Sequence, residues 1–325
     1  MKIFIYEYIL SSNKNYINKS TLLNEAKIII SALAKDFSDN LDVNSIKISL
    51  QNRHFKFLSS LLDNNKISFI DADNEIKIKA CISESDYAII LAPEENNVLS
   101  NIIKDFSKIN KNLINCSPDF INLTSDKYLL YKKFAKQNDF IMPVYKDYKD
   151  INKNKKIIAK IRDGLSAEDM YLFKNRRELE DNIYLINDKH VFQEYLNGDI
   201  ISVNTYFKDN SFKILSINEQ IYTIKERAFT LKKFIYGKFN SEVKQISSCI
   251  EGIVNNCDGI NGFIGFDIVR NKSKYLLIDI NPRLTTSYVG LRKTLNINPT
   301  LFIKNFNTIC DINTNRKYEL NLNIT

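Results

Sequence analysis

Two short segments in the C-terminal third of the chain alternate apolar and polar residues. In Gly262–Val269, Asp267 lies on the opposite face from its apolar neighbours. Tyr275–Asn281 alternates in the same way, with Asp279 and Asn281 on its polar face. Patterning of period two on both sides of a short polar turn predicts an antiparallel hairpin.

The register of this hairpin follows from a turn centred on Ser273. That turn places Asp267 opposite Asp279 and Gly265 opposite Asn281. It also predicts two apolar pairs on the core face of the hairpin, Phe266–Ile280 and Ile268–Ile278.

Two carboxylates that face each other on one side of a sheet repel, so this register indicates a bound cation. Asp267, Asp279 and Asn281 would supply hard oxygen ligands, which suit Mg²⁺. Gly265 leaves room for a bulky group such as a phosphate, and Arg283 would place a fixed positive charge beside the site. The alternative is a hairpin whose two aspartates are merely solvated.

The first third of the chain alternates predicted strands and helices, which indicates a small parallel sheet. A helix is predicted over Thr21–Phe37, with Ser20 as its cap. Strands are predicted at Lys2–Tyr8, Ile46–Leu50, Ile67–Ile70, Tyr87–Ala92 and Leu113–Cys116. Neither G-x-G-x-x-G after the first strand nor a P-loop motif occurs, so neither kind of nucleotide site is assigned. Glu94, which follows a strand end, is a candidate amine-binding group, with an exposed loop acid as the alternative.

Two lysines lie where a negative partner is expected. A helix predicted over Ser125–Gln137, capped by its first residue or by Thr124, puts Lys127 in the first turn, against the helix dipole. Lys160 lies in the apolar strand Lys156–Ile161, so its ammonium group would seek an anion. For Lys127, a solvated side chain is the alternative.

The rest of the chain continues with short elements. Val191–Leu196 and Ile200–Phe207 are predicted to form a hairpin around a tight turn. Further strands are predicted at Met170–Phe173 and Phe212–Asn218, and helices at Arg176–Asn182, Glu242–Asn255 and Leu301–Phe306. The tail from Asp311 is unassigned.

Composition narrows the class of protein. A chain of 325 residues and 37.8 kDa is long enough for two or three domains. The net charge of +8 permits a polyanionic partner, but the lysines are scattered, which favours a solvated surface over nucleic-acid binding. The five cysteines form no CxxC pair and only two histidines occur, so we expect no structural zinc, no disulfide framework and a cytoplasmic location. No segment reaches membrane-spanning length.

Five segments of the chain, in this order, match the sequence pattern of one superfamily. They are Ser125-Asp126-Lys127, Ala159-Lys160, Val191–Asp199, Gly265-Phe266-Asp267 and Ile278–Arg283. Together they resemble the ATP-grasp superfamily of carboxylate–amine ligases. The resemblance implies an α/β fold with a Rossmann-like parallel-sheet domain over residues 1–117, a small lobe with a connecting helix over 118–194 and a C-terminal lobe over 195–325.

The resemblance also implies roles for individual residues. Lys127 and Lys160 would hold the phosphates of ATP, and Lys160 and Arg283 would stabilise charge during phosphoryl transfer. The adenine would lie against Gln193, Glu194, Tyr195 and Leu196, and the ribose against Asp199. One or two Mg²⁺ or Mn²⁺ ions would bind Asp267, Asp279 and Asn281. The substrates would meet residues among Glu7, Glu94, Asn218, Gln220, Thr285 and Ser287.

Three further segments, Phe4–Tyr8, Leu91–Glu94 and Asn281–Tyr288, are similar to the branch that contains tyramine–L-glutamate ligases of methanofuran biosynthesis. This similarity implies an ADP-forming ligase that joins L-glutamate to tyramine or a related amine through an acylphosphate, acts on small molecules in the cytoplasm and forms a homodimer.

Two departures from the family pattern keep other readings open. Asp279 stands where the family generally has Glu, and the loop after Lys160 is poor in glycine. The alternatives are a nucleotide-binding protein without catalysis, a ligase for other amino acids or amines, and a basic nucleic-acid binder.

Overall fold

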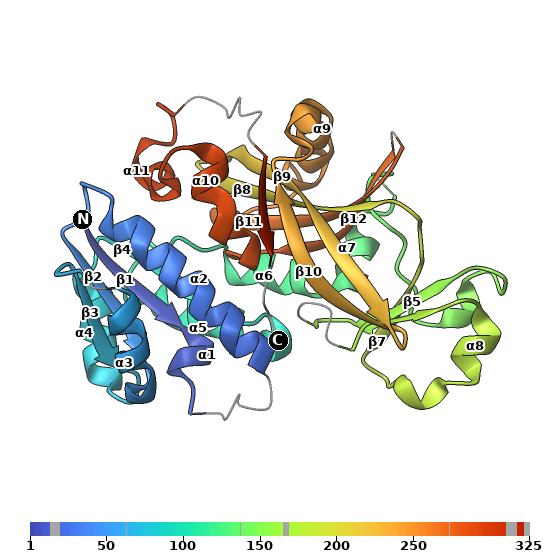
Figure 1. Ribbon diagram of the computed structural model, residues 1–325, viewed down its shortest axis with the longest axis horizontal. Helices are drawn as coiled ribbons and strands as arrows, with labels where there is room; N and C mark the ends of the chain where they lie inside the picture. The colour runs from blue at the N-terminus through green and yellow to red at the C-terminus, as the bar shows by residue number, and fades with distance from the viewer. Residues whose placement is uncertain are drawn as a thin grey trace.

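The computed structural model describes residues 1–13, 20–62, 64–136, 138–164, 169–272, 274–309 and 317–321. A parallel sheet (blue in Figure 1) lies at one end of the molecule, a small lobe (green) at the other, and a large antiparallel sheet between them. The mixed α/β architecture predicted from the sequence is confirmed. The predicted turn centre at Ser273 and most of the tail from Asp311 fall outside the described residues, and so does the side chain of the predicted cap Ser20.

The N-terminal sheet has four parallel strands in the order β3-β2-β1-β4. Its strands are β1 (Lys2–Glu7), β2 (Ser45–Leu50), β3 (Ile67–Asp71) and β4 (Tyr87–Leu91). Its helices are α1 (Tyr8–Ser11), α2 (Ser20–Ser38), α3 (Asn52–Leu61), α4 (Glu75–Glu84) and α5 (Val98–Phe106). Along β1, Phe4 packs into one hydrophobic cluster while Ile3 and Ile5 pack into another. Burial of both faces is the usual condition of a parallel sheet.

The predicted fifth strand, Leu113–Cys116, is wrong. Only Leu113 forms a bridge, to Ala88 of β4. The backbone N–H of Ile90 instead bonds to the side-chain oxygen of Asn115, whose amide nitrogen bonds back to the Ile90 carbonyl. A side chain therefore satisfies the edge of the sheet where a further strand was expected.

Two helices, α6 (Pro118–Ser125) and α7 (Lys127–Phe134), follow the parallel sheet. The predicted cap of the second helix is also corrected, because Asp126 performs this role and its carboxylate accepts hydrogen bonds from the N–H groups of Tyr128 and Leu129. Thr124 belongs to the preceding helix and bonds back to the carbonyl of Phe120. The chain thus breaks into two helices immediately before Lys127.

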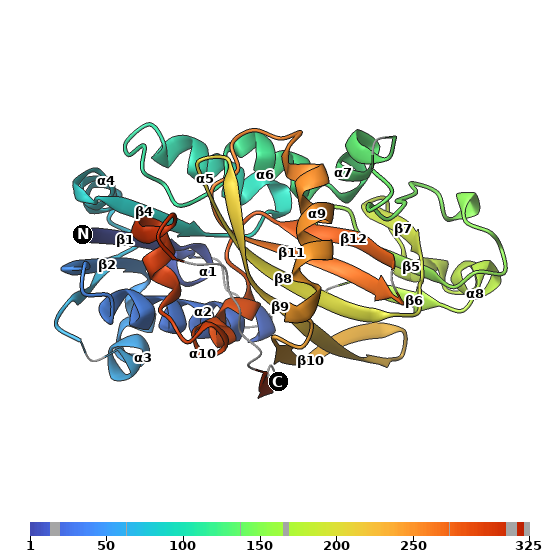
Figure 2. The same ribbon diagram turned by 90° about the horizontal axis from the view of Figure 1, so that it is seen from above.

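The small lobe consists of β5 (Ile157–Ile161), β6 (Tyr171–Phe173), α8 (Arg176–Glu180) and β7 (His190–Glu194). The large sheet is built from β8 (Asp199–Lys208), β9 (Ser211–Lys225), β10 (Ala228–Tyr236), β11 (Gly262–Asn271) and β12 (Lys274–Asn281), with α9 (Val243–Val254) across it (Figure 2). Both parts belong to one sheet of nine strands, joined where Ala228 of β10 pairs with Tyr171 of β6.

The predicted hairpin between Val191–Leu196 and Ile200–Phe207 is wrong. Strand β7 pairs with β5, whereas β8 pairs with β9 and β11. The segment between them crosses from the small lobe to the large sheet, and Gly198 lies so close to Arg270 that an added Cβ would be 2.4 Å from the Arg270 carbonyl oxygen. The residues that indicate a tight turn in the sequence therefore let the chain pass close to the backbone of Arg270. Two strands were not predicted at all, β10 and β13 (Tyr318–Asn321), which pair with each other.

The β11–β12 hairpin forms, and three of its four predicted pairs are confirmed. Asp267 faces Asp279, Phe266 faces Ile280 and Gly265 faces Asn281. Beyond this point the register shifts by one residue, so Ile268 faces Leu277 and the predicted Ile268–Ile278 pair is wrong. Ile278 is thus the extra residue of a β-bulge.

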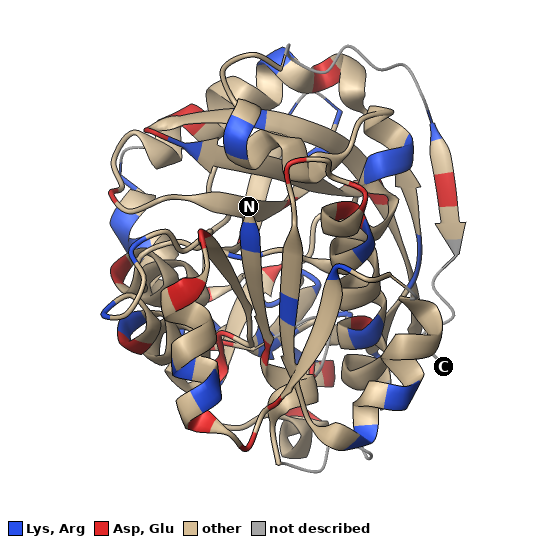
Figure 3. Ribbon diagram, turned by 90° about the vertical axis from the view of Figure 1, so that its left-hand side faces the viewer, with Lys and Arg blue, Asp and Glu red and all other residues tan. Residues whose placement is uncertain are grey.

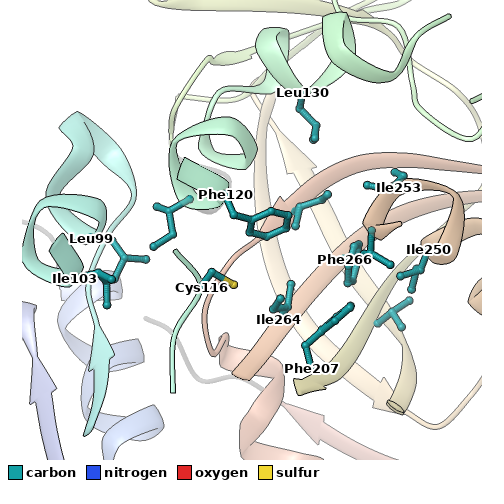
Figure 4. Packing of buried hydrophobic residues seen from close by; sticks show 14 of the residues in the cluster. Leu99, Ile103, Cys116, Phe120, Leu130, Phe207, Ile250, Ile253, Ile264 and Phe266 are labelled. Carbon is teal, nitrogen blue, oxygen red and sulfur yellow. The ribbon is translucent and has the colours of Figure 1, made fainter. Parts of the chain in front are cut away.

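A continuous hydrophobic core connects the parallel sheet to the large sheet (Figure 4). Phe120 of α6 lies between Leu99 of α5 and Phe266 of β11, and Ile250 of α9 covers the far side of Phe266. The apolar face of the hairpin is buried here, which leaves its polar face turned toward the small lobe. The predicted domain limits of 1–117, 118–194 and 195–325 stay a prediction.

The helices α10 (Leu291–Leu295) and α11 (Phe302–Asn305) pack against α2. The hydroxyl of Tyr288, in the turn before α10, donates to Asp36 of α2 at 2.8 Å. Lys and Arg are interspersed with Asp and Glu along the elements in Figure 3, as the scattered lysines predicted. In the described part of the chain, no helix has the length and apolar content needed to cross a membrane.

The close approach of Gly290 to Tyr236 gives the first testable prediction. An added Cβ at Gly290 would lie 2.4 Å from two ring atoms of the fully buried Tyr236, so Gly290→Ala should lower the free energy of unfolding by about 1–3 kcal/mol through overpacking. Gly252→Ala is the control, because Gly252 is exposed on α9 and faces only the end of the Asn138 side chain. The control should be neutral or stabilising by about 0.4–1 kcal/mol. Equal chemical-denaturation curves for the two variants would contradict this packing.

Candidate functional site

A cleft of about 540 Å³ opens between the small lobe and the large sheet. We call it the interlobe cleft. Its charged lining residues are Lys127, Lys160, Asp267 and Asp279, from four different elements, and Ile161, Gly164, Met170, Ile200, Gln220, Tyr222 and Ile278 complete it. The predicted phosphate-binding lysines and two of the predicted metal ligands thus meet in one cavity, although they are up to 152 positions apart in the sequence.

The two facing aspartates lie on the cleft side of the β11–β12 hairpin. Burial, with the neighbouring charge of Asp279, raises the pKa of Asp267 from 3.8 to about 6. Hydrogen bonds from Asn281 and Gln220 and the charge of Lys160 act in the opposite direction. The free energy cost of a second negative charge is therefore only partly offset by the protein's own groups, which is the condition that a bound cation would relieve.

A short chain of hydrogen bonds holds Asp267 in position. Gln220 of β9 donates from Nε2 to Asp267 Oδ1 at 2.7 Å, and the Tyr222 hydroxyl donates to Gln220 Oε1 at 2.6 Å. Asn281 donates from Nδ2 to Asp267 Oδ2 at 3.0 Å. Tyr222 was not predicted as a site residue, because nothing in its local pattern distinguishes it from an ordinary strand tyrosine.

Lys127 reaches the cleft from the first turn of α7. Its Nζ lies 3.2 Å from Asp279 Oδ2 and donates to the Gly164 carbonyl at 3.0 Å. The predicted negative partner of this lysine is thus the second aspartate of the hairpin. Asp126, which caps α7, also forms an ion pair with Arg162, with 2.5 Å between Asp126 Oδ2 and Arg162 Nη2. This ion pair connects the end of β5 to the helix.

Lys160 reaches the cleft from the small lobe and touches the bulge of the hairpin. Its Nζ donates a hydrogen bond to the carbonyl of Ile278 at 3.1 Å. Ile278 is the residue that the bulge leaves unpaired. Burial lowers the pKa of Lys160 to about 8, against the attraction of Asp279. The neighbouring aspartates thus compensate the charge of the buried Lys160 only in part. This agrees with the expectation that its ammonium group would bind an anion.

The predicted adenine segment lies at the end of β7. Gln193 is buried opposite Ile158, on the same strand face as Lys160, and its Nε2 has no hydrogen-bond partner in the described residues. Glu194 pairs with Lys155 at 2.6 Å, and the Tyr195 N–H bonds to the Lys156 carbonyl. Leu196 is half-buried in the crossing to β8. The unpartnered amide of Gln193 is therefore the polar group of this segment that fits a ligand.

Asp199, the predicted ribose ligand, is not brought into the cleft. Its carboxylate accepts a hydrogen bond of 2.8 Å from Arg270, which also pairs with Glu242. The adjacent residue Ile200 lines the cleft instead, because successive residues of a strand point to opposite faces. A ribose role for Asp199 stays a prediction.

A second cavity of about 490 Å³, which we call the N-terminal pocket, lies where β1, α2 and the end of β12 converge. Glu7, Glu25 and Arg283 line it. Arg283 Nε lies 2.9 Å from Oε1 of the buried Glu94. Glu7, Glu94 and Arg283 were predicted as site residues. Glu25 was missed because it is one acid on an amphipathic helix.

Burial changes the proton affinity of the acids in the N-terminal pocket. It raises the pKa of Glu7 to about 7, against hydrogen bonds from the N–H groups of Leu10 and Ile9 and the charge of Arg283. Burial likewise raises the pKa of Glu25, against Arg283 and a hydrogen bond from Thr286. Both carboxyl groups are therefore held in surroundings that penalise their charge.

Four of the predicted substrate residues line neither cavity: Glu94, which pairs with Arg283 beside the N-terminal pocket, and Asn218, Thr285 and Ser287. Ser287 is buried and donates to Asn204 at 2.7 Å, while Thr285 lies 2.8 Å from the Ser287 hydroxyl. Asn218 is fully buried and accepts a hydrogen bond from the Gly237 N–H. The space beside Gly265, expected to admit a phosphate, is occupied by Thr285, whose Cγ2 would lie 3.1 Å from an added Cβ.

The oxygen atoms around Asp267 fit a hard cation. Asn281 directs its Nδ2 at Asp267, which leaves its Oδ1 as the atom available to an ion. With the carboxylates of Asp267 and Asp279 it forms a set of oxygen ligands of the kind that Mg²⁺ and Mn²⁺ prefer. Among the described residues no group of three His, Cys, Asp or Glu side chains is placed to hold a metal.

Comparison with known proteins agrees with this geometry. Two tyramine–L-glutamate ligases are each 28% identical to the chain: that of Methanocaldococcus fervens with 94% of both chains covered, and that of Methanocaldococcus jannaschii with 94% of this chain and 89% of the relative covered. The crystal structure of an ATP-grasp superfamily protein from Archaeoglobus fulgidus matches with a TM-score of 0.74 at 20% identity, over 99% of this chain and 92% of that one. The model of the ATP-grasp domain matches residues 124–287, which is just over half of the chain and includes both lysines and both facing aspartates. The chain therefore belongs to the ATP-grasp family.

Proposed function

We propose that the protein is an ATP-dependent ligase that joins the carboxylate of L-glutamate to the amine of tyramine and releases ADP and phosphate. One observation supports this function most strongly: Lys127, Lys160, Asp267 and Asp279 converge in the interlobe cleft. The substrates are inferred from the two relatives that are named tyramine–L-glutamate ligases and align with 94% of the chain.

The chemistry needs ATP because a carboxylate and an amine do not condense in water. Transfer of the terminal phosphoryl group to the glutamate carboxylate gives an acylphosphate, whose carbonyl carbon the amine then attacks. In our proposal Lys127 and Lys160 hold the phosphates of ATP, and Gln193 with its neighbours up to Leu196 receives the adenine. Most of the rate enhancement would come from positioning and from charge stabilisation, as in other phosphoryl transfers.

Asp267, Asp279 and Asn281 are the residues that would hold one or two Mg²⁺ or Mn²⁺ ions. Such ions would neutralise phosphate charge. In the described structure Lys127 pairs with Asp279, so we infer that this lysine exchanges its carboxylate partner for a phosphate when a nucleotide enters. Arg283 pairs with Glu94, and its proposed role is to stabilise the developing negative charge from the N-terminal side.

The setting of the protein is also proposed. Its partners would be small-molecule carboxylates and amines, without nucleic acid. The four described cysteines are free thiols, which supports a reducing, cytoplasmic location. A homodimer stays a prediction.

The function is tested by ADP release from the full-length protein with tyramine and L-glutamate, each offered alone and together. We expect release that requires both substrates, and Asp267→Asn should lower the turnover at least about 100-fold because preorganised charge at a phosphoryl site contributes several kcal/mol. Asp258→Asn, at an exposed aspartate before β11, is the control and should leave turnover unchanged. Nucleotide binding without turnover over a broad set of amino acids and amines would refute the ligase in favour of a nucleotide-binding protein.

The buried carboxyl group of Glu7 should make the free energy of unfolding depend on pH. Its pKa is raised from 4.5 to about 7 in the folded protein, so the folded state binds more protons than the unfolded state between these pH values. Stability must then fall as the pH rises through this window, by up to roughly 3 kcal/mol from this group. Glu7→Gln should remove that loss.

The measurement is the free energy of unfolding at pH 5 and pH 8 for the wild type, Glu7→Gln and the exposed control Glu84→Gln. The difference between the two pH values should shrink in Glu7→Gln alone. The same pH dependence in all three proteins would show that Glu7 is not held in a penalising environment.

A further inference from the structure

The N-terminal pocket is built by segments from both ends of the chain. Glu7 ends β1, Glu25 lies in the second turn of α2, Leu91 ends β4, and Arg283 follows β12. Ligands of open α/β sheets bind beyond the carboxyl ends of the parallel strands, and the ends of β1 and β4 are such positions. The pocket is therefore placed where the N-terminal sheet can present a ligand to the large sheet.

Negative groups outnumber positive ones in and beside this pocket. Glu7 and Glu25 line it together with Arg283, the one cation among its described lining residues. Arg283 is already paired with Glu94 at 2.9 Å. Glu94 is 5% exposed, and neither of its oxygens has a hydrogen-bond partner in the described residues. Arg283 is thus shared among Glu94, Glu7 and Glu25. Among the described groups three carboxyl groups face one guanidinium, and this excess of negative charge favours a cationic ligand.

The other walls of the pocket are apolar. Leu22, Ala26 and Ile29 of α2 face the cavity together with Ile9 and Leu284. Such surface gains free energy by covering the hydrocarbon part of a ligand. The lining as a whole fits a molecule with one ammonium group on an apolar or aromatic body.

The N-terminal pocket adjoins the interlobe cleft. The chain runs from Asp279, which lines the cleft, to Arg283, which lines the pocket, within four residues. Tyr222 lines the cleft and lies within the electrostatic reach of Asp267, Glu25 and Asp279. A group bound at Glu25 is therefore near the place where an acylphosphate would form.

We propose that the N-terminal pocket is the binding site for the acceptor amine, in which Glu25 and Glu7 hold its ammonium group and Glu7 accepts a proton from it. This inference rests on the ligase function proposed above. The ammonium group transfers one proton to the Glu7 carboxylate, and the neutral nitrogen forms its bond to the acyl carbon as the bond from that carbon to the phosphate oxygen breaks. Phosphate leaves with the electron pair, and the nitrogen loses its second proton to the departing phosphate to give the amide.

The same arrangement sets the specificity for the amine. An amino acid carries a carboxylate beside its ammonium group. That carboxylate would lie among Glu7, Glu25 and Glu94, where the described residues offer it only Arg283, which those acids already share. Such juxtaposition of like charges excludes wrong ligands. A monoamine such as tyramine should thus be accepted and L-tyrosine rejected.

The test is steady-state ADP release by Glu25→Gln with tyramine as the varied amine. Loss of a charged hydrogen-bond partner should raise the KM for tyramine roughly tenfold or more. The KM values for ATP and L-glutamate should stay unchanged. The ratio of kcat/KM for tyramine to that for L-tyrosine should fall. Glu251→Gln, an exposed glutamate on α9, is the matched control. An unchanged KM for tyramine in folded Glu25→Gln, with the wild type active, would overturn the inference while the ligase function stands.

Calorimetric binding of tyramine separates the two proposals if the wild type shows no turnover. Binding to the wild type that weakens in Glu25→Gln would support the pocket although the ligase function had failed. Absent binding, or equal binding by both proteins, would overturn the pocket assignment. Thermal melting of each variant verifies that it is folded.

Discussion

The proposed site depends on the electrostatic repulsion between two buried carboxylates that face each other. Strands β11 and β12 bring Asp267 and Asp279 face to face, and burial makes the second charge costly. Lys127 and Lys160 reach this pair from α7 and β5, so groups from both lobes meet at one point. Because the lysines compensate the carboxylates only in part, the cleft is prepared for an additional cation together with the anionic phosphates of a nucleotide.

The remainder of the fold positions this centre. The apolar face of β11 is fixed in the core between α6 and α9, which turns the polar face toward the small lobe. The bulge at Ile278 directs a carbonyl group at Lys160. After β12, the chain continues directly into Arg283 and the N-terminal pocket, so the large sheet connects the proposed sites of phosphoryl transfer and amine binding.

Local patterns in the sequence were sufficient for the parallel sheet and for the pairing of Asp267 with Asp279, because alternation along two neighbouring strands determines their register up to the first irregularity. They could not reveal the bulge at Ile278, whose carbonyl group accepts a hydrogen bond from Lys160, 118 positions earlier in the chain. The cap of α7 was within reach of the sequence, since Asp126 directly precedes the helix.

Other features depend on residues that are distant in the chain. The crossing at Gly198 resembles a tight turn until the backbone of Arg270 is placed beside it. Glu25 and Tyr222 become site residues only when α2 and β9 are folded against the hairpin. The position of Asp199 also depends on the fold, which turns its neighbour Ile200 rather than Asp199 toward the cleft.

The most direct measurement of the central claim is Mn²⁺ binding, followed by electron paramagnetic resonance in the presence of ADP. If the facing carboxylates form a cation site, the wild type should bind Mn²⁺ together with ADP, and Asp279→Asn should lose most of the bound Mn²⁺ while remaining folded. Equal Mn²⁺ binding by the wild type and Asp279→Asn, or ADP binding that is indifferent to the ion in both proteins, would contradict the account.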